Sequence, residues 1–372
     1  MKHVWKKITI SLLCYGIAAI TPTVLLSTIH PNNQGIYHQI AHRGWSAKYF
    51  QNSYAAFDAA VGGTNSKFYG AETDLQMDQD GTIWCSHYIN PFENQSEKID
   101  ELTTAEINNR YLKIDGSIDN STLPSKAFPS GKLNPYKVKV PHDAQNAQLC
   151  KFWNADNNDG YLNCFLNNHA HPVIELKVES TLKIKEAKEC MKIDQGTINK
   201  LVTNVLVDIK AAEDYVTSGE SLLSRCYFVS FFDDLLDAMI KEINSQNLPI
   251  FNTQFQKLLD EGTVGQYVVS SNQQFTNKDP GTKSGSNTNY KNYQNYLDGS
   301  WTTINNQKYP IGVDIYYGLI TSKIIQATHS QNLKINSWTA DYSRLEIAEP
   351  YALAILDKFG CDYFTVDNWL DF

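Results

Sequence analysis

Short apolar runs rich in β-branched or aromatic residues recur along the chain between segments whose apolar residues repeat with helical spacing. The runs predict strands, and they occupy residues 38–43, 71–77, 82–87, 172–178, 227–231, 335–340 and 362–366. The periodic segments predict amphipathic helices, which occupy residues 53–61, 101–110, 181–192, 198–213, 233–245, 319–331 and 345–359. Strands that alternate with helices indicate a parallel sheet with crossover helices.

This alternation predicts an α/β fold. Residues 36–372 suit a (β/α)8 TIM barrel with long loop insertions, and an open doubly wound sheet is the second interpretation. No GxGxxG or GxxxxGK[ST] motif follows a predicted strand, which disfavours a nucleotide-binding open sheet. Residues 114–140 and 271–310 lack a period and are crowded with Asn, Gln, Ser and Gly. They predict irregular insertions, each either a lid over the barrel mouth or a solvated loop.

Charge narrows the function classes. The 372 residues include 32 Lys or Arg and 40 Asp or Glu, so the net charge is −8. An acidic body repels nucleic acid and anionic lipid, and no nucleic-acid partner is expected. The apolar content of 42 % is sufficient for a large core.

The N-terminal segment has the pattern of an export signal. Three lysines within residues 2–7 precede 22 uncharged positions, residues 8–29. Residues 1–30 therefore predict either a cleaved signal peptide or a retained N-terminal anchor, and a periplasmic or secreted protein. Membrane contact is expected only through this segment, which Pro22 weakens as a span. A lipid attached at Cys14 is disfavoured because Leu13 precedes it where a small residue is required.

The other cysteines are even in number, which permits disulfides in an exported chain. They are Cys85, Cys150, Cys164, Cys190, Cys226 and Cys361. Cys150 and Cys164 flank an Asn- and Asp-rich loop and are the first pair predicted to be bonded. No CxxC spacing occurs, which disfavours a zinc site.

Candidate chemistry begins at the end of the first predicted strand. His42, Arg43 and Gly44 follow one another there, and barrel enzymes keep their sites at strand carboxyl ends. Glu72 and Asp74 are two apart on the next strand, so both carboxylates point to one face. Neighbouring carboxylates repel unless they share a cation or a proton, which predicts half of a site for Ca²⁺ or Mg²⁺.

Further chemical groups follow along the chain. His87 ends a segment that the Asp80-Gly81 turn folds back beside the Glu72 strand, and Glu175 and Lys177 repeat the two-residue spacing. Two histidines, three carboxylates and two cations suit phosphodiester cleavage, which needs charge neutralisation and a paired acid and base. A glycoside hydrolase needs only two carboxylates.

Seven segments in order resemble the glycerophosphodiester phosphodiesterase family. They are HRG, QNSYAAFDAA, GAETDLQMDQDGTIWCSHY, IDELTTAEI, VIELK, FVSFFDDLLDAM, and INSWTA through GCDYFTVDN. The resemblance spans roughly residues 38–368, interrupted by the two irregular stretches.

The resemblance implies a (β/α)8 barrel that hydrolyses glycerophosphodiesters to glycerol 3-phosphate and an alcohol with one divalent cation, Ca²⁺ or Mg²⁺. By position it implies an acid/base pair (His42, His87), metal ligands (Glu72, Asp74, Glu175), phosphate contacts (Arg43, Lys177) and a wall of the substrate pocket (Trp338). Which histidine is the base stays open, as does the oligomeric state.

Two departures from the family pattern concern substrate identity. Gln51 replaces the Glu of a Pro-Glu-Asn-Thr element, and Tyr88 replaces the Asp after the second histidine. Two alternatives follow: a phospholipase C- or D-type enzyme acting on intact or lysophospholipids, or a non-catalytic barrel that binds a ligand. Exposed aromatic residues in the second insertion could contact a zwitterionic bilayer, namely Phe275, Tyr290, Tyr293 and Tyr296.

Overall fold

A computed structural model describes residues 38–46, 48–63, 66–94, 96–112, 148–177, 195–230, 233–248, 254–259, 301–304, 307–310, 312–316, 320, 322–340 and 356–367. The predicted export signal, the insertion at 114–140 and the helix at 181–192 lie outside the described residues, as do Cys14 and Cys190.

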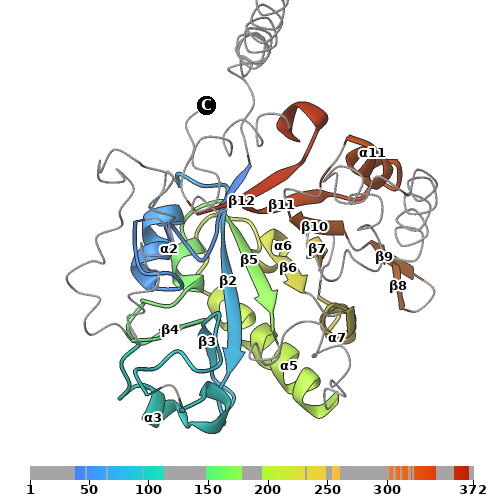
Figure 1. Cartoon of the computed structure of the whole chain (residues 1–372). Coiled ribbons are helices and arrows are strands. Elements are labelled where there is room, and N and C mark those ends of the chain that lie inside the picture. Colours follow the sequence, from blue (N-terminus) through green and yellow to red (C-terminus); the bar gives the residue numbers. More distant parts are fainter. Residues whose placement is uncertain are drawn as a thin grey trace, which may run out of the picture.

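Eight parallel strands form the centre of the molecule (Figure 1). They are β1 (Gln39–Ala41), β2 (Gly70–Met77), β5 (His171–Leu176), β6 (Tyr227–Ser230), β7 (Gln254–Leu259), β10 (Gly312–Tyr316), β11 (Ile335–Ala340) and β12 (Tyr363–Val366). Each strand pairs with the next in this order, and β1 also pairs with β12. These pairings join the strands into a ring, which confirms the predicted α/β barrel.

All seven predicted strands are present, but two barrel strands were missed. Strand β7 has the sequence QFQKLL and β10 has GVDIY. Neither is a sustained apolar run, because Gln, Lys and Asp interrupt them.

Antiparallel strands extend the sheet on one side. Strands β3 (Ile83–Cys85) and β4 (Cys150–Lys151) follow β2, and the turn at Asp78–Gly81 folds β3 against β2 as predicted. A separate hairpin joins β8 (Trp301–Ile304) to β9 (Gln307–Pro310). The prediction of an irregular stretch through 271–310 was therefore wrong at its end, where alternation of Thr, aromatic and polar residues suits two short strands.

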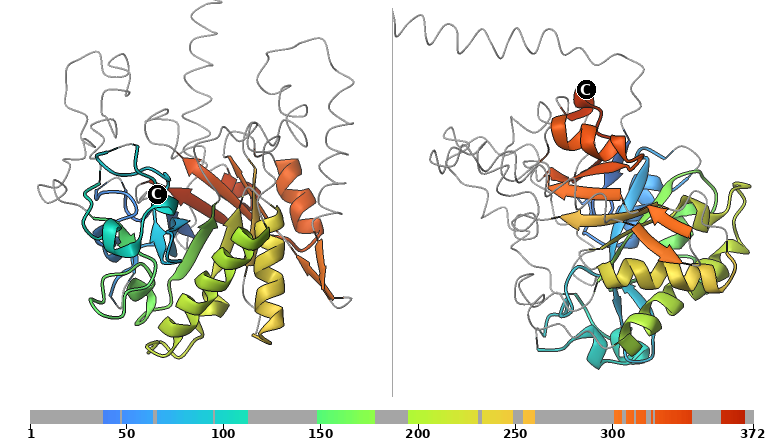
Figure 2. Two further views of the ribbon diagram at one scale, coloured as in Figure 1. Left: turned by 90° about the horizontal axis from the view of Figure 1, so that it is seen from below. Right: turned by 90° about the vertical axis from the view of Figure 1, so that its right-hand side faces the viewer.

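Helices cover the outside of the strands. The longer ones are α2 (Tyr54–Val61), α5 (Gln195–Glu213), α7 (Asp233–Ser245) and α11 (Ser322–Ser330), and all four were predicted. Helices α5 and α7 lie side by side (Figure 2). The predicted helix at 101–110 is only a short turn of 3₁₀-helix, η1 (Ile99–Glu101), followed by α3 (Thr104–Ile107). The remaining short elements are η3 (Leu162–Phe165) and α6 (Leu222–Arg225).

Only the end of the predicted helix at 345–359 lies within the described residues. No helix in the described ranges combines the length and the apolar character that a bilayer span requires.

Alternation along the strands separates two layers of side chains. On β2, Ala71 and Leu75 join the large apolar core between strands and helices, whereas Glu72 and Asp74 take the other face. That other face lines the barrel interior, which also holds a small apolar cluster that includes Val173. The interior is therefore where the charged residues of β2 must find partners.

Aromatic rings fill the amino-terminal end of the barrel, and we call this group the ring layer. Its members begin or directly precede five strands: His38, Tyr69, His171, Tyr227 and Tyr363. The Tyr227 hydroxyl is 3.0 Å from the hydroxyls of both Tyr69 and Tyr363, so the three phenols form one hydrogen-bonded chain. The His171 ring stacks on Tyr69 with centroids 4.2 Å apart.

Candidate active site

The turn after β1 places the first site residues. Arg43 and Gly44 both have left-handed backbone conformations, with φ of 56° and 75°. A Cβ on Gly44 would lie 2.6 Å from the carbonyl carbon of Ala56, so glycine is required for the turn to pack on α2. This turn directs the Arg43 backbone N–H to Glu72 Oε2 at 2.9 Å.

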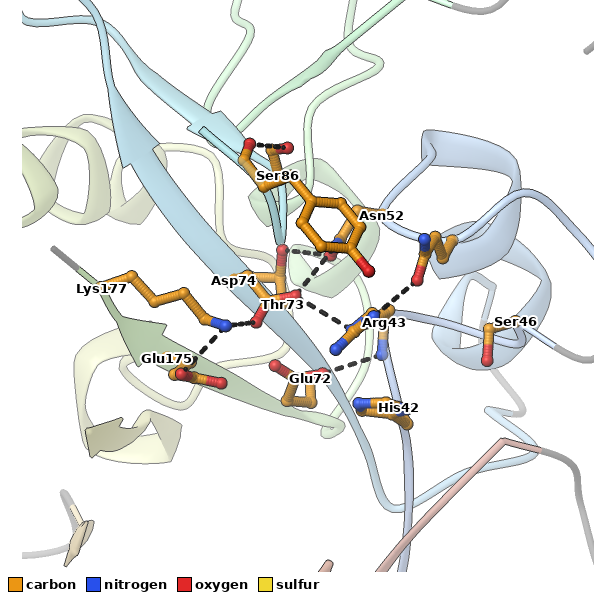
Figure 3. Close-up of polar contacts among 12 residues, drawn as sticks. His42, Arg43, Ser46, Asn52, Glu72, Thr73, Asp74, Ser86, Glu175 and Lys177 are labelled. Carbon is orange, nitrogen blue, oxygen red and sulfur yellow. Dashed lines mark hydrogen bonds and ion pairs between the residues drawn. The ribbon is translucent and has the colours of Figure 1, made fainter. Parts of the chain in front are cut away.

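Three carboxylates gather at the carboxyl ends of β2 and β5. Glu72, Asp74 and Glu175 are buried, and one oxygen from each lies within 4.8 Å of the others (Figure 3). Asp74 and Glu175 are paired positions in the parallel register of β2 and β5. The expectation that these residues come together is confirmed.

Both predicted cations lie against Asp74. Lys177 Nζ is 2.8 Å from Asp74 Oδ1 and 3.2 Å from Glu175 Oε1, and Arg43 Nε is 3.2 Å from Asp74 Oδ2. Asn52 Nδ2 donates to the same Oδ2 at 3.0 Å and accepts on its Oδ1 from Thr73 Oγ1 at 3.0 Å. Asp74 is thus the centre of the charge network (Figure 3).

Burial and neighbouring charges shift the pKa values of the three carboxyl groups in different directions. Burial first, then the charges of Asp74 and Glu175, raise the pKa of Glu72 well above its usual range. Burial also raises the pKa of Glu175, to about 8, with Asp74 adding to the rise. Burial opposes ionisation of Asp74 as well, but Lys177 and Arg43 outweigh it and hold the pKa of Asp74 well below its usual range.

His42 is paired with a carboxylate that sequence analysis missed. Its Nδ1 lies 2.7 Å from Oδ1 of Asp367, the residue after β12, and Ser46 Oγ donates to the same oxygen at 3.3 Å. The His42 backbone N–H donates to Val366 O at 2.9 Å, which fixes the two chain segments side by side. With Nδ1 held by the carboxylate, Nε2 of His42 is the ring nitrogen left for chemistry.

His87 lies just beyond β3. Burial, and then the charges of Lys177 and Arg43, hold its pKa well below the usual range. Its Nδ1 is buried and makes no hydrogen bond to any described residue. Both predicted acid/base residues therefore lie beside the network around Asp74, with Asp74 and His42 close enough to shift the pKa of His87.

Gln51 and Tyr88, which depart from the family pattern, each contact a residue of the site. Gln51 Oε1 accepts from Arg43 Nη1 at 2.7 Å, so an amide holds the guanidinium that also contacts Asp74. The ring of Tyr88, half exposed, lies perpendicular to the His87 imidazole with centroids 4.6 Å apart.

Trp338, predicted to wall the pocket, lies on the opposite side of the interior. Its Nε1 donates to Asp314 O at 3.1 Å, and its ring packs against the small apolar cluster inside the barrel. The role of Trp338 at the substrate stays a prediction.

The carboxylate cluster fits a divalent cation. Three buried carboxylates face only two cationic side chains, so their full ionisation leaves one uncompensated negative charge. Burial first, and then the neighbouring carboxylates, raise the pKa values of Glu72 and Glu175. Carboxylate oxygens are the ligands that Ca²⁺ and Mg²⁺ prefer, and Glu72, Asp74 and Glu175 are the residues to hold one.

Solved structures share the fold. A putative glycerophosphoryl diester phosphodiesterase from Agrobacterium tumefaciens aligns with a TM-score of 0.53 at 12 % identity, over 90 % of this chain and 94 % of that one. A second, from Silicibacter pomeroyi, aligns with a TM-score of 0.52 at 16 % identity, over 91 % of each chain. No curated protein sequence matches the chain.

A protein-family model decides the assignment. The glycerophosphoryl diester phosphodiesterase family matches residues 42–370, nearly the whole chain, starting at the histidine of the first turn. Together with the barrel and the buried network at its carboxyl end, this match shows that the chain belongs to the glycerophosphoryl diester phosphodiesterase family, a family of phosphoric diester hydrolases.

Proposed function

We propose that this protein hydrolyses glycerophosphodiesters to glycerol 3-phosphate and an alcohol with the help of one divalent cation. The observation that carries the proposal is the buried cluster of Glu72, Asp74 and Glu175, with His42 and Asp74 both close enough to His87 to shift its pKa. A bound cation draws negative charge from the phosphoryl oxygens. Arg43 and Lys177, already held at Asp74, add positive charge at the same place.

The two histidines divide the proton transfers. His42 acts as the base, because Asp367 holds its Nδ1 and stabilises the imidazolium that forms when Nε2 takes the proton of the attacking hydroxyl. That hydroxyl belongs to water or to the glycerol moiety. His87 gives a proton to the leaving alcohol oxygen as the phosphorus–oxygen bond breaks. This step requires the negative charge of the bound phosphodiester to raise the pKa of His87, which burial, Lys177 and Arg43 hold low in the site without substrate.

The test is release of glycerol 3-phosphate by the full chain from glycerophosphocholine and glycerophosphoethanolamine, with Ca²⁺, with Mg²⁺ and with EDTA. Turnover should need the cation, and Glu72→Gln and His42→Ala should each lower kcat by at least about 10²-fold. Glu101→Gln, which alters an exposed carboxylate, is the matched control and should leave kcat unchanged. A folded protein with no turnover under either ion would contradict the proposal.

The alternative substrate, an intact or lysophospholipid, depends on the aromatic residues of 271–300, which lie outside the described residues. Vesicles of phosphatidylcholine in the same assay separate the two substrates. Export remains part of the proposal, supported by the lysines of residues 2–7 and the uncharged run at 8–29. Mass spectrometry of protein recovered after export shows whether residues 1–30 have been removed.

A further inference from the structure

Three buried thiols lie in one part of the outer core, where β3, β4 and η3 meet. They belong to Cys85, Cys150 and Cys164, and all three are free in the structure. The structure therefore contains no disulfide among the three, neither the predicted bond between Cys150 and Cys164 nor any other. The arrangement of the three sulfurs nevertheless distinguishes one pair from the others.

Cys85 and Cys150 lie directly opposite each other on neighbouring antiparallel strands. Cys85 of β3 is the register partner of Cys150 of β4, just as Trp84 is the partner of Lys151. Opposite residues of an antiparallel pair have Cα atoms about 4.5 to 5.5 Å apart, with both side chains on one face. Disulfides span Cα separations of about 4.4 to 6.8 Å, a range that includes the usual spacing of such a pair.

Cys164 is placed differently from these two. It lies on η3 rather than on a strand, and its Sγ points to the carbonyl of Gly160 in the preceding turn at 3.9 Å. The thiol of Cys85 contacts that of Cys150, and this hydrogen bond together with burial raises the pKa of Cys150. The register of β3 and β4 is thus what places the thiols of Cys85 and Cys150 beside each other.

We propose that Cys85 and Cys150 form a disulfide that fixes β4 to β3, the strand that leads into His87. The bond would form by thiol–disulfide exchange with a disulfide oxidant during folding. The Cys85 thiolate attacks the oxidant and releases one thiol, and the Cys150 thiolate then attacks Cys85 Sγ and releases the second. Two cysteine protons are lost, and the electron pair reduces the oxidant to two thiols.

Burial of the two thiols determines when the disulfide can form. Once the core is closed, both sulfurs are shielded from solvent, and the Cys150 thiol, whose pKa is raised, reacts slowly. Exchange is therefore expected while the strands are pairing, and the finished bond is expected to resist reductants in the folded protein. This proposal does not depend on the proposed substrate.

The experiment is refolding of the full chain from denaturant in reduced and oxidised glutathione, followed by blocking of free thiols and non-reducing peptide mapping. The expected product links Cys85 to Cys150 and has lost two hydrogens. Cys164→Ser, the matched control, should give the same link. Free Cys85 and Cys150 after oxidative refolding, or any other partner for either of them, would overturn the proposal.

A second measurement keeps the proposal testable if a cysteine variant folds poorly. In the oxidised wild-type protein, unfolding in the presence of dithiothreitol should occur about 5 to 10 °C lower than without it, because a loop of some 65 residues is released. Cys164→Ser should show the same shift. Cys150→Ser should show none, and an unchanged midpoint in the wild type would count against the bond.

Discussion

At the carboxyl ends of the strands the barrel interior holds three carboxylates and two cationic side chains, whereas at the amino ends it holds three tyrosines and two histidines. The first end is crowded with charges that raise or lower one another's pKa values. The second end is closed by stacked rings and a chain of phenol hydrogen bonds. The carboxyl end of the barrel is therefore the end suited to chemistry, and the amino end is the one that contributes to stability.

Strand β12 shows the contrast within six residues. Asp362, just before the strand, pairs with His329 at 2.9 Å and with Lys334 at 2.8 Å on the exposed amino side. Asp367, just after the strand, pairs with His42 at 2.7 Å. Two similar Asp–His contacts are therefore available for direct comparison, and only one of them is at the proposed site.

The largest expected effect comes from Asp367→Asn. The substitution removes the negative charge that stabilises the His42 imidazolium, so kcat for glycerol 3-phosphate release should fall by about 10²- to 10⁴-fold. Asp362→Asn is the matched control and should leave kcat within about twofold. Steady-state kinetics on both variants measure this, and equal losses would show that the two ends do not differ in function.

The next largest effect is the dependence of stability on pH that His171 of the ring layer causes. Burial lowers the pKa of His171 to about 4, below its unfolded value of about 6.5. The folded state therefore binds fewer protons in this window. The contribution to stability is complete above pH 6.5 and is lost as pH falls towards 4, by up to about 3 kcal/mol.

Urea denaturation between pH 4 and 7 tests this loss. His171→Phe keeps a ring at the position but cannot titrate, so its stability should depend less steeply on pH than that of the wild type. His169→Gln, at an exposed neighbouring histidine, should retain the wild-type slope. Parallel slopes for all three proteins would rule out His171 as the source.

A smaller effect is expected from Tyr227→Phe. It removes the middle hydroxyl of the phenol chain and leaves Tyr69 and Tyr363 each without one partner. The free energy of unfolding should fall by about 1–2 kcal/mol, with kcat unchanged. Tyr215→Phe, at an exposed ring, should be neutral in the same denaturation experiment. A loss of kcat without loss of stability would contradict the assigned role.

The smallest effect is expected at the rim of the charged end. Tyr88→Leu removes the ring that packs against His87, an interaction of about 0.5–1 kcal/mol, so kcat should fall by about two- to fivefold. Tyr88→Phe keeps the ring contact and should restore kcat. Tyr111→Leu, at another exposed ring, should have no effect, and a similar loss there would point to a general change of the surface.

Local sequence pattern was sufficient to predict part of the fold and part of the candidate site. The two-residue spacing of Glu72 and Asp74 on an apolar run predicted a shared face, and the barrel interior is that face. The turn at Gly81 likewise predicted the return of the chain towards His87. Such signals lie within one strand or one turn, where backbone geometry alone fixes side-chain direction.

The missed features depend on contacts between distant segments. Asp367 is 325 positions from His42, and nothing in the spacing along the chain indicates that the two meet. Strand β7 was missed because Gln254, Gln256 and Lys257 interrupt its apolar residues, and only its pairing with the distant strands β6 and β10 identifies it as a strand. The ring layer could have been predicted from the sequence, since an aromatic residue precedes or begins five barrel strands.

The contact between His42 and Asp367 also sets an order of events in the life of the chain. One partner follows β1 and the other follows β12, so the pair exists only after β12 has docked beside β1. A chain in which β12 has not yet docked has its carboxylates but lacks the Asp367 contact that holds His42. Under the proposed mechanism, hydrolysis should therefore begin only after β12 has docked beside β1, so the onset of turnover would report completion of the barrel.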